Sequence, residues 1–359
     1  MVEKIVPLRE RCQYFSLEVP SQSVWGEPIW AGGFLLDRFM AAYILASGES
    51  VLFIDSGWDN DLAAYMLNEA LELLAQVGLK ASRYFLLNTH SDWDHAWANR
   101  AFKQRLGSRL QIASSLETFL AMRQDLHSYE VERRQKGAEA SYFATSSIEL
   151  PNLLWADREK LFLGRLEVRF IKVSAHCPGQ LTLWLPQLKI LFAADSCEAP
   201  LPFPQNELSL AEQLANFKYL LSLGAKQVWP AHHLAWSEHL PASPGAAGQP
   251  ELLLANYNYY QQLEANCLAY ASASLKAECS AWLASKRAQL SALLNNEEAW
   301  TKPRTLAQAE LLAQLQGWEE RYHIDIAYLA KQTGQDCSPL FYQRAHHLAA
   351  LMYLEKYFG

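Results

Sequence analysis

A segment rich in Pro, Gly, Ala and Ser, residues 241–250 (PASPGAAGQP), divides the chain into two parts with different hydrophobic patterns. Before it, residues 1–240 alternate short strand-like runs with helical stretches, which is typical of α/β folds. After it, residues 251–359 show almost only helical periodicity. Because 359 residues exceed what one compact core usually needs, we expect an α/β domain, a linker and an all-α C-terminal region.

The periodicity predicts individual elements in both parts. Strand-like runs in the first part include Ala41–Ala46, Val51–Ile54, Tyr84–Leu87 and Leu110–Ala113, with three or four more between Leu161 and Phe192. Helices are expected at Asp59–Val77, Ala96–Leu106 and Leu116–Lys136. The helices expected in the second part are Glu251–Tyr270, Ser274–Asn295, Leu306–Tyr322 and Pro339–Phe358. Two β-rich blocks, each followed by helices, indicate a sandwich of sheets that helices cover.

The composition indicates a large core and argues against several partners. Half of the residues are apolar, and the net charge of −7 comes without any cluster of Lys and Arg, so we expect no nucleic-acid partner. The six cysteines form no CxxC pair and are expected to be reduced and mostly buried: Cys12, Cys177, Cys197, Cys267, Cys279 and Cys337. No apolar run reaches the ~20 residues of a membrane span, and the N-terminus lacks the apolar stretch of a signal peptide. We therefore expect a cytoplasmic protein with no membrane association.

The densest polar cluster is residues 88–99 (NTHSDWDHAWAN), which follow a strand-like run and precede a helix. Four residues of metal-ligand type lie within six positions: His90, Asp92, Asp94 and His95. A turn from strand to helix can direct alternate side chains into one pocket, and the N-terminus of the helix favours carboxylates there. The cluster therefore predicts metal binding.

This segment resembles the signature His-x-His-x-Asp-His of the metallo-β-lactamase superfamily, with Asp92 in the place of the usual second histidine. Four further motifs of the family follow in order: Phe53–Gly57 (FIDSG), Ala175–Gly179 (AHCPG), Ile190–Ser196 (ILFAADS) and Val228–His232 (VWPAH). The resemblance covers about residues 35–235. It implies a four-layer αββα sandwich as the catalytic domain, residues 1–240, followed by the all-α region.

The resemblance also implies a two-metal site. Its ligands would be His90, Asp92 and His176 for metal 1, Asp94, His95 and His232 for metal 2, and Asp195 as a bridge. Two divalent ions ~3.5–4 Å apart share a water and lower its pKa, so a bridging hydroxide attacks the substrate. Asp94 is expected to orient this hydroxide as well as to bind metal. Asp55 is expected to fix the loop under the metals through hydrogen bonds rather than to bind metal itself.

Asp92 departs from the family pattern and bears on the choice of metal. Three carboxylates and a hydroxide balance two divalent ions, and replacing imidazole by carboxylate shifts preference from zinc toward iron or manganese. Related flavodiiron proteins carry a Glu at this place and bind iron, together with a flavodoxin-like domain that we do not find in this sequence. Zinc remains the first choice because of its frequency in the family.

The implied function is hydrolysis of an ester, thioester, lactone or related acyl bond in a small-molecule substrate. The alternative is a di-iron redox or oxygen-binding protein on the same fold, which Asp92 suggests. A binding protein without activity is disfavoured by the complete ligand set, and a nuclease by the acidic balance. The helical region is expected to form a lid, a wall of the pocket or a homodimer surface.

The remaining candidates receive structural interpretations. His233 is the alternative to His232 as the last ligand, and the Pro-x-His spacing favours His232. Packing roles are expected for residues beside the ligands (Cys177, Cys197, Trp93 and Trp97) and for the tyrosines of the first C-terminal helix (Tyr257, Tyr259, Tyr260 and Tyr270). The pair His346–His347 lacks acidic neighbours at ligand spacing and is expected to be exposed. No role is assigned to His127, His239 and His323.

Overall fold

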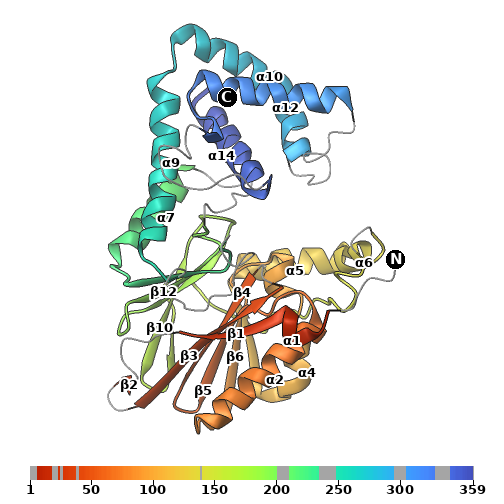
Figure 1. Cartoon of the computed structure of the whole chain (residues 1–359), viewed down its shortest axis with the longest axis vertical. Helices are drawn as coiled ribbons and strands as arrows, with labels where there is room; N and C mark the ends of the chain where they lie inside the picture. The colour runs from red at the N-terminus through yellow and green to blue at the C-terminus, as the bar shows by residue number, and fades with distance from the viewer. Residues whose placement is uncertain are drawn as a thin grey trace. The chain divides into compact units, whose positions relative to one another are not determined.

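The computed structural model describes residues 6–17, 23–24, 27–37, 40–137, 140–199, 210–233, 248–294, 305–327 and 340–358. Its contacts divide the chain into two units (Figure 1). Unit 1 comprises Met1–Val173, Pro178–Ser196 and Gly224–Pro250, and unit 2 comprises Ser174–Cys177, Cys197–Leu223 and Glu251–Gly359. Most of the predicted linker, residues 241–247, lies outside the described residues. None of the helices that the structure describes has the length and apolar character needed to cross a membrane.

Unit 1 contains two sheets. The larger has the order β1-β3-β4-β5-β6-β7-β8, with β2 paired to β3. Its strands are β1 (Cys12–Ser16), β2 (Ser23–Val24), β3 (Glu27–Leu36), β4 (Met40–Ser47), β5 (Ser50–Ile54), β6 (Arg83–Leu87), β7 (Leu110–Ser114) and β8 (Leu153–Leu154). Strands β3, β4 and β5 are antiparallel neighbours, whereas β5, β6 and β7 run parallel. The carboxyl ends of these three parallel strands therefore meet at one edge of the sheet.

The smaller sheet has the order β13-β12-β11-β10-β9. Its strands are β9 (Lys160–Leu163), β10 (Leu166–Lys172), β11 (Leu181–Leu185), β12 (Ile190–Ala194) and β13 (Gln227–Pro230). The consecutive strands β9, β10, β11 and β12 are antiparallel neighbours, whereas β13 pairs parallel to β12. This parallel pair again brings two carboxyl ends together.

Strand β4 shows why the two sheets stack. All of its residues are buried, because side chains alternate between two separate apolar cores. Ala42 and Ile44 belong to the core shared with helices α2 (Asn60–Gln76) and α4 (Asn99–Leu106). Tyr43 and Leu45 belong to the core shared with the smaller sheet. Unit 1 thus has a helical layer and two sheet layers, with the helices over one face of the larger sheet (Figure 1).

Two of the helices predicted in unit 1 are broken in the structure. Of the stretch predicted as Ala96–Leu106, Ala96 is the last residue of α3 (Trp93–Ala96), and the helix α4 begins only at Asn99. The stretch Leu116–Lys136 forms α5 (Leu116–His127) and α6 (Glu130–Gln135). The second break lies at Tyr129, whose φ of 55° is left-handed and cannot continue a right-handed helix. The short helix α1 (Leu8–Arg11) precedes β1.

Unit 2 is helical. Its helices are α7 (Leu210–Ser222), α9 (Glu251–Ala269), α10 (Ala273–Leu294), α12 (Leu306–Arg321) and α14 (Leu340–Phe358). The last four confirm the predicted C-terminal helices to within one residue at each end. Aromatic side chains fill the core: Phe217 stacks on Tyr260, and the Tyr353 hydroxyl donates to the carbonyl of Tyr260 at 2.7 Å. Tyr259 is fully buried as well, so two of the four tyrosines predicted to pack are core residues. The fold is an α/β sandwich with an all-α C-terminal region.

Candidate metal centre

The loop from β6 to α3 contains the ligand-type cluster that the sequence predicts. It starts where β6 ends beside the end of β5, with Leu87 in register with Ile54. The next residue of β5's chain, Asp55, thus lies beside the loop. Asp92 is the residue that precedes α3, so Asp94 and His95 fall in the first turn of that helix. The parallel pairing of β5 and β6 therefore places Asp55 under this loop.

Asp55 holds the loop through three contacts. Its backbone has a φ of 63°, in the left-handed region, and its side chain is buried. Oδ1 accepts from the Thr89 backbone N at 2.7 Å, and Oδ2 accepts from the Thr89 hydroxyl at 2.8 Å. Oδ2 also lies 2.8 Å from Nδ1 of His95. Because a carboxylate only accepts, Nδ1 of His95 carries a proton, and Nε2 is the nitrogen available to a metal.

Thr89 extends this control to the next histidine. Its hydroxyl donates to Asp55, so the same oxygen is left to accept from Nδ1 of His90, which lies 3.0 Å away. Nε2 of His90 is therefore likewise the nitrogen available to a metal. One buried carboxylate thus sets the tautomers of both His90 and His95.

The parallel pair β12–β13 supplies two more of the predicted ligands. Ala194 and Pro230 are in register, with Asp195 and Ala231–His232 directly after them. Ala194 has a φ of 47°, and its carbonyl accepts from the Ala231 backbone N at 3.2 Å. The ends of the two strands are thereby tied together, which brings Asp195 and His232 close to each other.

Asp94, His95, His232 and Asp195 converge in unit 1. Nε2 of His95 lies 3.4 Å from Nε2 of His232 and 3.3 Å from Oδ1 of Asp195. Nε2 of His232 lies 3.2 Å from Oδ2 of Asp94 and 3.5 Å from Oδ2 of Asp195. The contact between His95 and Asp94 is longer, at 3.8 Å.

These distances fit a cation with nitrogen and oxygen ligands. A tetrahedral zinc with ligands at about 2.0–2.1 Å separates neighbouring ligand atoms by about 3.3 Å. The distance between the two Nε2 atoms, 3.4 Å, matches that separation. The close approach of the two Nε2 atoms is explained by a shared cation or a shared proton. The donor set of two imidazoles and two carboxylates suits zinc and iron.

His90 and Asp92 form a wider group with Asp195. Nε2 of His90 lies 3.6 Å from Oδ2 of Asp195 and 3.7 Å from Oδ2 of Asp92. His90 is fully buried, whereas the Asp92 side chain is 30% exposed. Asp195 therefore faces His90 through Oδ2 and His95 through Oδ1, as a bridging carboxylate would.

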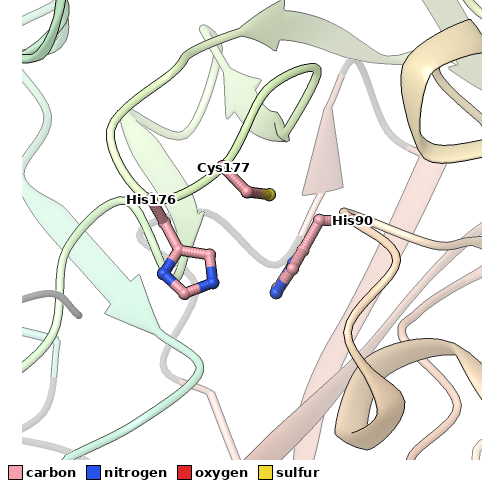
Figure 2. Close-up of side chains that lie close together, drawn as sticks. All are labelled: His90, His176 and Cys177. Atoms are coloured by element: carbon pink, nitrogen blue, oxygen red, sulfur yellow. The ribbon is translucent and has the colours of Figure 1, made fainter. Parts of the chain in front are cut away.

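His176 and Cys177 follow β10, in the segment Ser174–Cys177. Figure 2 shows these two side chains with His90, and one ligand atom of each lies within 4.8 Å of the others. A second such group comprises His176, Asp195 and Glu198. Neither Cys177 nor Glu198 was predicted as a ligand from the sequence. Their signals were their positions directly after His176 and three residues after Asp195.

The charges of the centre depend on protons or a cation. Burial lowers the pKa of His95, but the carboxylates of Asp195, Asp94 and Asp55 outweigh it and raise that pKa well above its usual value. The pKa of His232 is raised in the same way. Burial raises the pKa of Asp195, but the facing histidines outweigh this effect and hold the pKa well below its usual value. A divalent cation would supply the positive charge that these carboxylates demand, and it would displace protons from the rings.

The two ends of the segment 88–99 are joined by a reciprocal amide pair. Nδ2 of Asn88 donates to Oδ1 of Asn99 at 2.9 Å, and Nδ2 of Asn99 donates to Oδ1 of Asn88 at 2.7 Å. Both side chains are fully buried. This pair closes the loop that holds His90 to His95, and it was not predicted from the sequence.

Aromatic residues pack beside the loop. Trp93 contacts Trp58, Tyr142 and Phe143 with centroids 5.3 to 5.7 Å apart, and Trp97 is buried against Phe143. The packing interpretation of both tryptophans agrees with these contacts. Cys177 and Cys197 are buried, as predicted. His233 is half-buried and belongs to none of the ligand groups found among the described residues, whereas His232 does.

The chain is similar in sequence and in fold to known proteins. The family model for the metallo-beta-lactamase superfamily matches residues 37–232, which include all seven predicted ligands. Similar solved structures include a metallo-beta-lactamase from Pontibacter korlensis, at 16% identity and a TM-score of 0.49 over 69% of this chain and 99% of that one. Another is the metallo-beta-lactamase IND-7, at 12% identity and a TM-score of 0.46 over 68% of this chain and 98% of that one. A third is VMB-1, at 15% identity and a TM-score of 0.46 over 69% of this chain and 97% of that one. A search of curated proteins found no match.

Proposed function

We propose, on the premise that this chain belongs to the metallo-β-lactamase superfamily, that it is a binuclear metal-dependent hydrolase of an acyl bond in a small molecule. Esters, thioesters and lactones are the substrate classes. The observation that carries the proposal is the convergence of Asp94, His95, Asp195 and His232 at the separations of a shared cation. The geometry of these four residues comes entirely from unit 1.

In this proposal, each ligand has a defined task. Asp94, His95 and His232 hold one metal, His90, Asp92 and His176 hold the other, and Asp195 bridges them. Bound there, two divalent ions would lower the pKa of a water and polarise the scissile carbonyl. Asp55 keeps the proton on Nδ1 of His95 and, through Thr89, on Nδ1 of His90, so both rings present Nε2.

Asp94 is the residue that we assign to orient the water. Its Oδ2 faces His232, which leaves Oδ1 to accept the proton of the attacking water. Replacing Asp94 by Asn keeps the size of the side chain and removes this acceptor. We expect hydrolysis to fall about 10²–10⁴-fold, the usual contribution of a positioned base. The assay measures turnover of a panel of esters, thioesters and lactones, and wild-type turnover in Asp94→Asn would exclude this role.

The proposed metals are zinc first, with iron and manganese as the alternatives that Asp92 favours. A carboxylate at this position adds a hard, anionic ligand beside His90, and its Oδ2 lies 3.7 Å from Nε2 of that ring. We expect two metals at this centre in protein purified without added zinc, and a shift toward zinc in Asp92→His. Elemental analysis of both proteins measures this directly. An unchanged metal selectivity in Asp92→His would refute the role assigned to Asp92.

The second candidate is a di-iron redox or oxygen-binding protein, and Asp92 is the observation that favours it. The same preparation decides between the two. Coloured protein with iron and an oxo-bridge absorption band supports redox chemistry. Colourless zinc protein that hydrolyses members of the acyl panel supports the hydrolase.

A further inference from the structure

A second group of ligand-type side chains lies within the helical unit. Glu319 on α12 and the pair His346 and His347 on α14 are buried, with exposures of 2%, 0% and 3%. One ligand atom from each lies within 4.8 Å of the others. The expectation that the histidine pair is exposed is therefore wrong. Its acidic partner comes from a different helix, which sequence spacing could not reveal.

The contacts in this cluster hold all three side chains in place. Nδ1 of His347 lies 2.7 Å from Oε1 and 2.9 Å from Oε2 of Glu319. Nδ1 of His346 is hydrogen-bonded to the hydroxyl of Tyr259 on α9. Ligating histidines in proteins usually use their second nitrogen for such a partner, which fixes the ring and leaves the other nitrogen for the metal. For His346 that other nitrogen is Nε2, which is fully buried and makes no hydrogen bond of acceptable geometry in the described part of the chain.

The electrostatics of the cluster favour a cation. Burial raises the pKa of Glu319, and the carboxylates of Asp325 and Glu320 raise it further, while His347 lowers it. Burying a carboxylate is costly unless a positive charge accompanies it. Burial and then His347 lower the pKa of His346 well below its usual value, more than the backbone of Ile324 raises it.

We propose that Glu319, His346 and His347 form a second metal site in the helical unit, independent of the proposed catalytic centre. Two imidazoles and one carboxylate are a donor set for a divalent transition metal, of which zinc is the first choice. A metal there would join α12 to α14 across the core of the unit. Its function would be structural, because binding to the folded state alone stabilises that state.

The test first removes the proposed catalytic centre and leaves the cluster intact. The full chain carrying Asp195→Ala and His232→Ala is stripped with a chelator and titrated with zinc, with far-UV circular dichroism as the check of folding. We expect about one zinc per chain, against about three in the wild type. No zinc bound to this folded variant would overturn the second site. This variant leaves Glu319, His346 and His347 unchanged.

Substitutions in the cluster then assign the remaining metal. In the same background, Glu319→Gln should reduce binding from about one zinc per chain to none, and His346→Gln should do the same. Glu320→Gln is the matched control, because Glu320 is the exposed neighbour on the same helix, and it should retain the metal. Zinc that persists in both Glu319→Gln and His346→Gln would overturn the assignment. Two metals in the wild type and none in the background variant would overturn the second site and would still agree with the proposed function.

Discussion

Replacement of Asp55 by Asn tests whether this carboxylate sets the ring nitrogen that His90 and His95 offer to a metal. The amide keeps the shape of the side chain, and its oxygen can still accept from the Thr89 backbone N. In place of Oδ2, however, an NH₂ group would face both the Thr89 hydroxyl and Nδ1 of His95. This group only donates, so Nδ1 of His95 would have to accept and the ring proton would move to Nε2.

The same change would reach His90. Because the new amide would donate to the Thr89 hydroxyl oxygen, the hydroxyl could turn and donate its own proton to Nδ1 of His90, 3.0 Å away. The proton of that ring would then also move to Nε2. Both rings would present an N–H to the metal positions, and each must shed that proton before binding.

Loss of such a partner typically lowers metal affinity 10–100-fold, which is about 1.4 to 2.7 kcal/mol for each metal. We expect this weakening for both metals in Asp55→Asn, measured as Kd by competition with a chromophoric chelator at neutral pH. Asp61→Asn is the control, because Asp61 is exposed on α2 and its replacement makes the same change in charge. Equal Kd values for wild type and Asp55→Asn would refute the tautomer argument.

Two further predictions concern the bridge and the start of α2. Asp195→Ala and His176→Ala should each abolish turnover and metal binding at the proposed catalytic centre, and retained activity in either would count against the ligand assignment. Asp59 caps α2, and although burial raises its pKa, hydrogen bonds from Thr145, Leu62 and Arg11 lower it below the usual value. Its contribution to stability is thus present above the unfolded pKa of about 3.9 and lost as pH falls through the folded one. Asp59→Asn should cost about 1–2 kcal/mol in denaturant unfolding at pH 7, a difference that shrinks on acidification; a constant difference would contradict the linkage.

The sequence was informative where chemistry is local. His90 to His95 lie within one short segment, and Asp195 and His232 each follow a strand-like run, so motif order could indicate them. Their convergence requires the parallel pairing of β5 with β6 and of β12 with β13. Side-chain alternation does not encode which strands become neighbours, and only the resemblance to a known fold supplied that information.

Features that depend on distant partners were missed. Tyr129 interrupts a predicted helix because it adopts a left-handed backbone, although its neighbours have helical propensity. The pair His346–His347 carries no sign of burial in its own helix, since Glu319 lies on another one. Strand β3 was also not predicted, because its Gly32–Gly33 pair interrupts the apolar run; both glycines face aromatic rings of β1, and a Cβ at Gly33 would lie 2.2 Å from Phe15.

The amide pair between Asn88 and Asn99 has a consequence for how this centre could change over time. Because hydrogen bonds join the two ends of the segment, residues 88–99 form a closed loop, and the length of this loop sets the positions of its ligands. Lengthening or shortening that loop would displace His90 and His95 together. Under the proposed function, variation in substrate choice should therefore accumulate in segments outside residues 88–99, while the length of residues 88–99 stays constant.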